Sequence, residues 1–229
     1  ISKSLKFNDG DTGYLGKTFG SSGNRRLWTF SAWVKKSTLD IDGYIIGAGT
    51  ASAFEFIKIS NSSTDELEYA YWNGSAYAYQ IRTTAVFRDI ANWYHIVVAV
   101  DTAQSTASDR VKFYVNGTQI TSFSISSYPT QNADTQINHS VDTRIGSGIG
   151  GTYFDGYMAD INFIDGAALT STSFGREVDG VWIPKDTSGL TFGNNGVRLQ
   201  FRDEVVGSST GYSGYFTADN IAFSHASHY

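Results

Sequence analysis

Aromatic and acidic residues alternate around an Asn-Gly pair in one segment of this chain, which makes that segment a candidate for ligand binding. Residues 66–82 read Glu-Leu-Glu-Tyr-Ala-Tyr-Trp-Asn-Gly-Ser-Ala-Tyr-Ala-Tyr-Gln-Ile-Arg. Asn and Gly both tolerate a positive φ, so Asn73 and Gly74 predict a two-residue turn between two strands. With that turn, strand alternation places four side chains together on one exposed face: Glu68, Trp72, Tyr77 and Tyr79.

This predicted face has the chemistry of a sugar-binding surface. Aromatic rings stack on the apolar faces of sugars, and a carboxylate such as that of Glu68 fixes hydroxyl groups. The opposite face of the hairpin, which carries Leu67, is then predicted to belong to the core. The alternative is that these aromatic residues only pair across strands or pack beneath a loop, without a ligand.

Two loops carry oxygen ligands that suit a hard cation. Asn8, Asp9 and Asp11 share one short loop, and Asp101 and Asp109 flank another. Calcium takes several such oxygens, and the chain has no Cys, so calcium is the cofactor that the sequence suggests. Neither loop has the dense ligand pattern of an EF-hand, and the alternative is that these acids are solvated turn residues.

The sequence favours a non-enzymatic protein. Retaining glycoside hydrolysis needs two carboxyl groups on one face, about 5 to 5.5 Å apart. Glu66 and Glu68 share a face, as do Asp160 and Asn162, but no strand carries the Glu-φ-Asp-φ-φ-Glu pattern that glucanases use. His95 lies within an apolar strand signal, and we expect a half-buried, hydrogen-bonded histidine there rather than a catalytic base.

The elements that would position these residues are short strands. Strand signals recur at 4–7, 27–35, 44–48, 53–60, 66–72, 76–82, 93–100, 111–115, 119–125, 143–146, 154–164 and 197–202, with Gly, Asn, Asp and Ser between them. The Asn116-Gly117 pair, which follows the signal at 111–115, predicts a two-residue hairpin turn. A helical pattern is confined to residues 166–175, with one short helix expected near Ala168 to Phe174. The chain is therefore predicted to be all-β, a two-sheet antiparallel jelly-roll sandwich with at most one short helix. Eight residues in the most apolar strands are predicted to be core: Trp33, Val98, Val100, Phe113, Val115, Met158, Ile161 and Phe163.

Composition narrows the range of functions. A chain of 229 residues with 24 Gly, 2 Pro and 15% aromatic residues suits one β-sandwich domain. The net charge of −5, with scattered basic residues, disfavours nucleic acid, and without an apolar run of 18 residues we expect no membrane insertion. We expect a domain over residues 1–202, followed by an extension over 203–229 that packs on it or links to a missing segment. The chain begins with Ile, so we expect it to be processed, trimmed or cut from a longer protein.

Several motifs resemble a known family. Trp-Tyr-His-Ile-Val at 93–97 is followed by Tyr-Val-Asn-Gly at 114–117, Arg-Ile-Gly at 144–146 and Phe-Asp-Gly-Tyr-Met-Ala-Asp-Ile at 154–161. This series resembles the laminin-G-like branch of the concanavalin A-like jelly rolls. A longer colinear set resembles jelly-roll domains in tail-fibre and other virion proteins of tailed bacteriophages, notably marine ones: residues 4–9, 14–15, 23–26, 28–35, 93–101, 155–160, 163–169 and 180–185.

The resemblance implies a virion structural protein on the exterior surface, in a tail fibre, a tail or the outside of a capsid. Its expected partners are other virion proteins, further copies of itself, with a trimer typical of fibres, and host surface polysaccharide. The alternative is a purely structural decoration or spacer domain whose exposed aromatic residues bury against neighbouring subunits. A glycoside hydrolase of the concanavalin A-like superfamily is a third reading.

Overall fold

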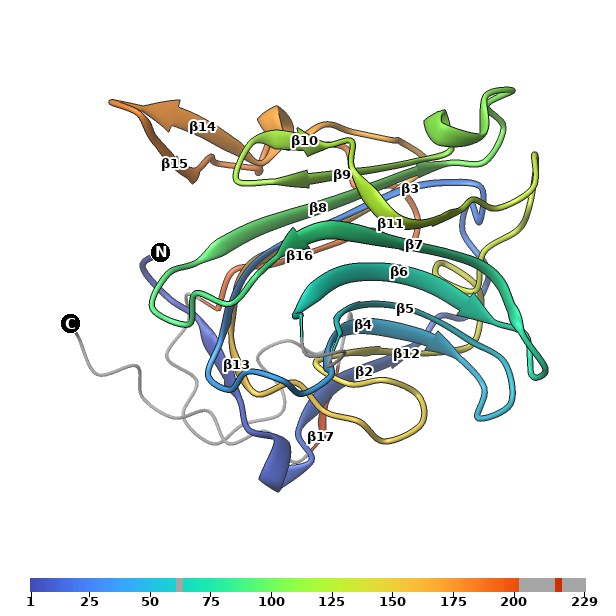
Figure 1. Cartoon of the computed structure of the whole chain (residues 1–229), viewed down its shortest axis with the longest axis horizontal. Coiled ribbons are helices and arrows are strands. Elements are labelled where there is room, and N and C mark those ends of the chain that lie inside the picture. The colour runs from blue at the N-terminus through green and yellow to red at the C-terminus, as the bar shows by residue number, and fades with distance from the viewer. Residues whose placement is uncertain (61–63, 202–216, 220–229) are drawn as a thin grey trace.

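Alternating apolar residues fold into two antiparallel sheets in the computed structural model, which describes residues 1–60, 64–201 and 217–219. The two sheets stack face to face, as Figure 1 shows. The seven-stranded sheet has the order β1-β13-β3-β8-β9-β10, with β16 beside β13. Its strands are β1 (Leu5–Phe7), β3 (Leu27–Lys36), β8 (Tyr94–Asp101), β9 (Val111–Val115), β10 (Thr118–Ile120), β13 (Gly156–Asp165) and β16 (Val197–Leu199).

The eight-stranded sheet has the order β11-β7-β6-β5-β4-β12-β2-β17. Its strands are β2 (Tyr14–Thr18), β4 (Gly43–Gly49), β5 (Phe54–Ile59), β6 (Glu66–Trp72), β7 (Tyr77–Val86), β11 (Phe123–Ser127), β12 (Asp142–Ile145) and β17 (Thr217–Asp219). The all-β, two-sheet prediction is confirmed. The short strand β17, which pairs with β2, is the part of the expected 203–229 extension that the structure describes; the rest of that extension lies outside the described residues.

The core lies between the two sheets. All eight predicted core residues are 8% exposed or less, and seven of them belong to the main cluster between the sheets. Trp33 is the exception, because it lies on the outer face of the seven-stranded sheet and stacks on His95.

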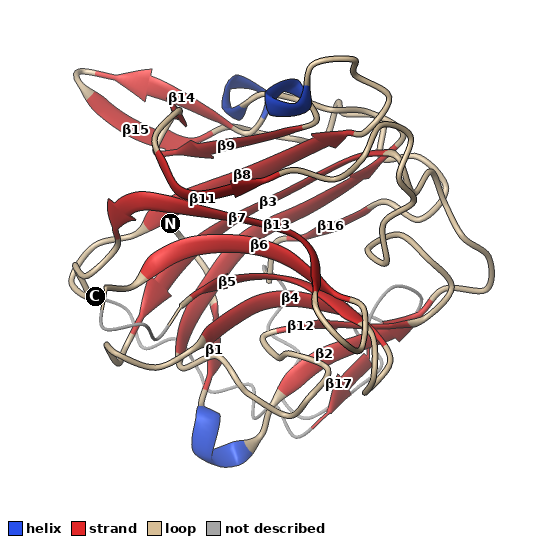
Figure 2. Ribbon diagram, turned by 45° about the vertical axis from the view of Figure 1, so that its right-hand side comes forward, coloured by secondary structure: helices blue, strands red, loops and turns tan. Residues whose placement is uncertain are grey.

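The outer face of the seven-stranded sheet is itself partly buried. A second cluster there joins Val97 and Tyr114 to Ile164 and Phe174, with partly buried apolar residues of the 167–192 segment against it. Figure 2 shows the hairpin of β14 (Gly175–Val178) and β15 (Val181–Pro184) lying beside β9. Strands with two buried faces read as continuous apolar runs, which explains the unbroken run in β8.

Turn chemistry was predictable at one hairpin. Asn116 and Gly117 connect β9 to β10 with φ of 48° and 87°, and Val115 pairs with Thr118, which confirms the two-residue turn. Glycine is needed at position 117 for two reasons: its φ is positive, and a Cβ there would lie 2.7 Å from Cε3 of Trp182.

Helical structure in the described ranges consists of three single 3₁₀ turns: Asp9–Asp11, Ala107–Asp109 and Ser171–Ser173. The last turn lies inside the segment where a short helix was predicted. The first two were not predicted, since at most one short helix was expected. No helix of the described chain is long and apolar enough to cross a membrane.

Candidate functional site

Five aromatic side chains gather on the outer face of the eight-stranded sheet, across β4 to β7. We call them the aromatic patch: Tyr44, Phe54, Phe56, Trp72 and Tyr77. The rings of Trp72 and Tyr77 lie 5.4 Å apart, edge to face, and those of Phe56 and Tyr77 lie 6.5 Å apart. Tyr44 packs against Phe56 at 5.2 Å. Tyr77 is 45% exposed, so the patch opens to solvent at this end.

Strand alternation on β5 explains the floor of the patch. Ile57 and Ile59 point into the core, so Phe54, Phe56 and Lys58 point outward. The Lys58 Nζ lies 5.1 Å from the centre of the Phe56 ring, within the range of a cation–π contact. Sequence reasoning predicted this strand but not that it pairs with β6, and therefore missed its contribution to the site.

The loop after β12 forms one border of the patch. Gly47 on β4 is close to this loop, since a Cβ at Gly47 would lie 3.1 Å from the carbonyl oxygen of Ser147. Gly148 packs on the Tyr44 ring, where a Cβ would approach to 2.8 Å. The patch is therefore closed on the β4 side and open toward Trp72 and Tyr77.

The predicted position of Tyr79 is wrong. In the β6–β7 hairpin Trp72 pairs with Tyr77, but Tyr71 pairs with Tyr79, so Ala78 is an extra residue in the ladder. Such a bulge reverses the alternation beyond it. Tyr79 consequently points into the core at 3% exposure, while Tyr77 stays outside.

The turn explains why the predicted register fails. The connection is four residues long, 73–76, and the Asn73 Oδ1 accepts hydrogen bonds from the backbone N–H groups of Ser75 and Ala76. Gly74 takes a φ of 101°, but Asn73 keeps a negative φ. The Asn73 side chain therefore stabilises a wider turn than the two-residue one that Asn-Gly predicts.

Glu68 lies on the predicted face but beneath the surface. It is fully buried, and its carboxylate accepts hydrogen bonds from the Gln80 Nε2 at 2.6 Å and from an Arg82 guanidinium nitrogen at 3.1 Å. Lys58 lies 3.9 Å from the same carboxylate and 2.9 Å from that of Asp42. The prediction that Glu68 is exposed is therefore wrong: its charge is balanced within the sheet, and it supports the patch from below.

The phenol groups at the patch stay neutral. Burial raises the pKa of Tyr44, and burial followed by the negative charge of Glu68 raises the pKa of Tyr77. The two cations Lys58 and Arg82 lie beside three anions, Asp42, Glu66 and Glu68. The patch thus combines apolar rings with a polar margin in which both cations are paired.

The first candidate calcium loop folds as a self-contained turn. The Asn8 side chain donates to Asp11 at 2.9 Å and accepts from the N–H of Gly10, and Asp9 is exposed. Across residues 1–60, 64–201 and 217–219, no group of three or more His, Cys, Asp or Glu side chains converges as a metal site. Calcium binding at this loop remains a prediction.

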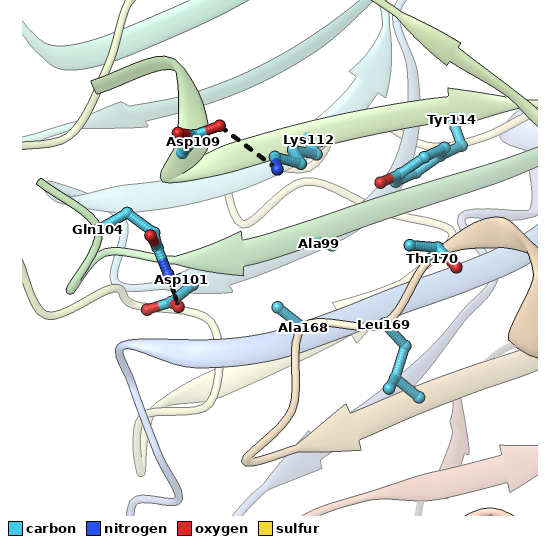
Figure 3. Close-up of a pocket in the computed structure, with 9 residues that line it drawn as sticks. All are labelled: Ala99, Asp101, Gln104, Asp109, Lys112, Tyr114, Ala168, Leu169 and Thr170. Atoms are coloured by element: carbon cyan, nitrogen blue, oxygen red, sulfur yellow. Dashed lines mark hydrogen bonds and ion pairs between the residues drawn. The ribbon is translucent and has the colours of Figure 1, made fainter. Parts of the chain in front are cut away.

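The second candidate calcium loop borders a hollow on the other sheet. Asp101 accepts hydrogen bonds from the Ala103 N–H and from the Gln104 side chain, and Asp109 pairs with Lys112 at 3.4 Å. Figure 3 shows the side chains of Asp101, Gln104, Asp109 and Lys112 around the hollow. The structure places Asp101 and Asp109 at the same hollow, and neighbouring groups engage the oxygens of both.

The residues considered as catalytic candidates, His95, Glu66 and Glu68, are engaged by neighbouring side chains. His95 is fully buried rather than half-buried: its Nε2 contacts the Ser31 hydroxyl at 3.0 Å, and its Nδ1 accepts from the Trp182 indole at 2.9 Å. Burial lowers the pKa of His95 from 6.5 to about 3, so the ring is neutral near pH 7. Glu66 and Glu68 both lie beside Arg82.

The fold and this arrangement of sheets define a known class of protein. The chain belongs to the Concanavalin A-like lectin/glucanases superfamily, whose laminin-G-type family matches residues 9–173. This match confirms the resemblance to laminin-G-like jelly rolls. No curated protein sequence matches the chain.

Solved structures with a similar fold come from several kinds of protein. Domain 4 of AbnA, an extracellular GH43 arabinanase of Geobacillus stearothermophilus solved with arabinotriose, has 19% identity and a TM-score of 0.52, over 74% of this chain and 73% of that one. The heptameric SAP-like pentraxin of Limulus polyphemus has 19% identity and a TM-score of 0.48, over 72% of both chains. Domains LG4-5 of the mouse laminin α1 chain have 11% identity and a TM-score of 0.49, over 87% of this chain and 47% of theirs.

Proposed function

We propose that this protein is a non-enzymatic carbohydrate-binding domain and that the aromatic patch is its ligand surface. The observation that carries the proposal is the pair of rings, Trp72 and Tyr77, that borders the open end of the patch beside a polar margin of paired charges. Sugar rings have apolar faces that pack on aromatic side chains and hydroxyls that need polar partners.

The paired charges at the margin of the patch favour neutral sugars. An acidic sugar needs an unpaired cation, but Lys58 is paired with Asp42, and Arg82 with Glu68. The patch is also a surface across several strands rather than a closed pocket, which suits units within a polysaccharide chain. A domain of the same fold has been solved with arabinotriose, which supports this use of the architecture.

The biological setting that we propose is the exterior of a bacteriophage virion, where the domain would contact host surface polysaccharide. The support is the colinear sequence resemblance to tail-fibre and other virion proteins, which runs from residue 4 to residue 185. In that setting the domain would be repeated by oligomerisation, as a trimer in a fibre, with other virion proteins as neighbours. Several copies raise the effective affinity by about 10² to 10⁴ where geometry permits, so weak single sites suffice.

A structural role is the second candidate. Tyr77, Val86, Ile90 and Val181 are between 43% and 61% exposed, and exposed apolar residues bury well against a neighbouring subunit. This role predicts that the patch is covered in the assembled particle. A glycoside hydrolase is the weakest candidate, because Glu66 and Glu68 both neighbour Arg82.

A glycan array tests the proposal. The intact protein, Trp72→Ala and Tyr77→Ala are compared with Ile90→Ala, which removes a side chain of similar exposure outside the patch. Loss of a stacked ring should weaken binding at least about tenfold, whereas Ile90→Ala should bind like the parent protein. Equal binding by all four proteins would show that the aromatic patch is not the ligand surface, and binding by none of them would favour the structural role.

A further inference from the structure

The hollow bordered by Asp101 and Asp109 lies on the outer face of the seven-stranded sheet, the opposite sheet from the aromatic patch. Its volume is about 300 Å³. Strands β8 and β9 form the floor, and the segment of Ala168, Leu169 and Thr170 forms a wall, as Figure 3 shows. Pockets that hold small ligands begin at about this size.

Firm contacts hold the wall in place. The buried Thr29 hydroxyl on β3 donates to the Ala167 carbonyl at 2.7 Å and accepts from the Leu169 N–H at 2.8 Å. Directly after the wall, the Ser171 hydroxyl donates to the Gly117 carbonyl in the β9–β10 turn. The wall is thus anchored at both ends, and the hollow is a fixed feature of the fold.

A small residue creates the space. Ala99 sits between Thr29 on β3 and Lys112 on β9 in the sheet register. The neighbouring outward residue on β8, Val97, is covered by the second apolar cluster, but only a methyl group projects at Ala99. The hollow therefore continues down to the sheet at this position.

The lining combines the groups that hold a sugar. Tyr114 supplies an aromatic side chain, and the hollow is bordered by two carboxylates, Asp101 and Asp109, the ammonium of Lys112 and the amide of Gln104. Carboxylates accept hydrogen bonds from hydroxyls, whereas the ammonium and amide groups donate to hydroxyl or ring oxygens. Two anions against one cation disfavour a ligand that carries a carboxylate.

We propose that this hollow is a second saccharide site, which takes a single neutral pyranose at the end or branch of a glycan. The proposal extends the carbohydrate-binding function proposed above but rests on separate residues. The patch would bind sugar units along a polysaccharide, and the hollow would bind one sugar unit. The domain would then have one saccharide site on the outer face of each sheet. A ligand of one sugar ring has few atoms, so its dissociation constant should be about millimolar.

Two-dimensional ¹H–¹⁵N NMR of the whole chain tests the proposal. The probes are the methyl glycosides of glucose, galactose, mannose and N-acetylglucosamine, with methyl glucuronide as the acidic counterpart. The backbone amides of Ala99, Asp101, Lys112 and Leu169 should shift with at least one neutral probe and less with the glucuronide. These shifts should persist in Trp72→Ala, which leaves the hollow intact.

Two variants of the hollow complete the test. Ala99→Leu fills the space, and Asp101→Ala, whose side chain is partly exposed, removes an acceptor without overpacking the sheet. Each should abolish the shifts or raise the dissociation constant at least about tenfold. The proposal is overturned if none of the probes moves these amides, if Asp101→Ala responds like the parent protein, or if calcium chloride without sugar gives the same shifts, which would make the hollow a cation site. If Trp72→Ala loses glycan binding on the array and no probe shifts the amides of the hollow, the proposal for the aromatic patch is supported and the proposal for the hollow is refuted.

Discussion

Protonation of His95 should destabilise the fold as the pH falls. The ring is fully buried and neutral, with Trp182 donating its indole N–H to Nδ1 and therefore with the ring proton on Nε2, toward Ser31. A proton added to Nδ1 would face another N–H and would break that hydrogen bond. It would also place a charge where water does not reach.

The pKa difference gives the size of this effect. Burial lowers the pKa of His95 from 6.5 to about 3, so the unfolded chain takes up a proton at a higher pH than the folded one. The stability that neutral His95 contributes is thus complete above pH 6.5 and is lost as the pH falls toward 3. Between pH 7 and pH 4.5 the loss should be about 3 kcal/mol.

Urea unfolding of the parent protein and of His95→Gln at both pH values measures this effect. Other groups titrate equally in both proteins, so the difference between their free energies of unfolding isolates His95. That difference should shrink by about 3 kcal/mol at the lower pH. Trp33 and Trp182 both stack on the ring, at 4.9 and 6.0 Å, and cation–π attraction to them opposes the effect. A difference that stays constant, or a His95 titration near pH 6.5 by NMR, would refute the reasoning.

Three further predictions concern stability. Burial raises the pKa of Glu55 to about 7, so the carboxyl group of the folded protein is charged only at higher pH. Between pH 5 and pH 8 the free energy of unfolding in urea should therefore fall by about 3 kcal/mol more for the parent protein than for Glu55→Gln. The same pH dependence in both proteins would contradict this. Phe113→Ala should cost about 3 to 5 kcal/mol because the ring is fully buried, and a loss near zero would show that β9 is misplaced. Gly117→Ala should lower the melting temperature more than Gly180→Ala, since both have positive φ but only at Gly117 would the new Cβ meet Trp182; equal losses would mean that this contact is unimportant.

The dipeptide Asn-Gly occurs at two hairpins, and their comparison shows what the sequence could and could not predict. Asn116-Gly117 forms the predicted two-residue turn, because β9 and β10 pair without a bulge beside it. Asn73-Gly74 does not, because the Asn73 side chain caps a wider turn and Ala78 bulges out of β7. A bulge costs little locally and leaves no pattern in the sequence, yet it moves Tyr79 from the predicted surface into the core.

The order of the strands in the sheet, which the sequence did not predict, mattered more for the candidate site. The segments that became β4 and β5 were predicted as strands, but local alternation does not say which strands become neighbours. Sequence reasoning therefore did not include Tyr44, Phe54 and Phe56 in the site, although it predicted the strands that carry them. Trp33 was placed correctly as buried, but its face was not predictable, since both faces of β3 are covered.

The Trp72 indole signal in NMR tests the central claim most directly. The chain has five Trp, and the indole of Trp28 is buried and donates to Thr135, so it serves as an internal control. Titration with the best glycan from the array should shift the Trp72 indole resonance while that of Trp28 stays in place. A Trp72 signal that no array glycan moves, or that moves only together with Trp28, would contradict the account of the aromatic patch as the carbohydrate-binding surface.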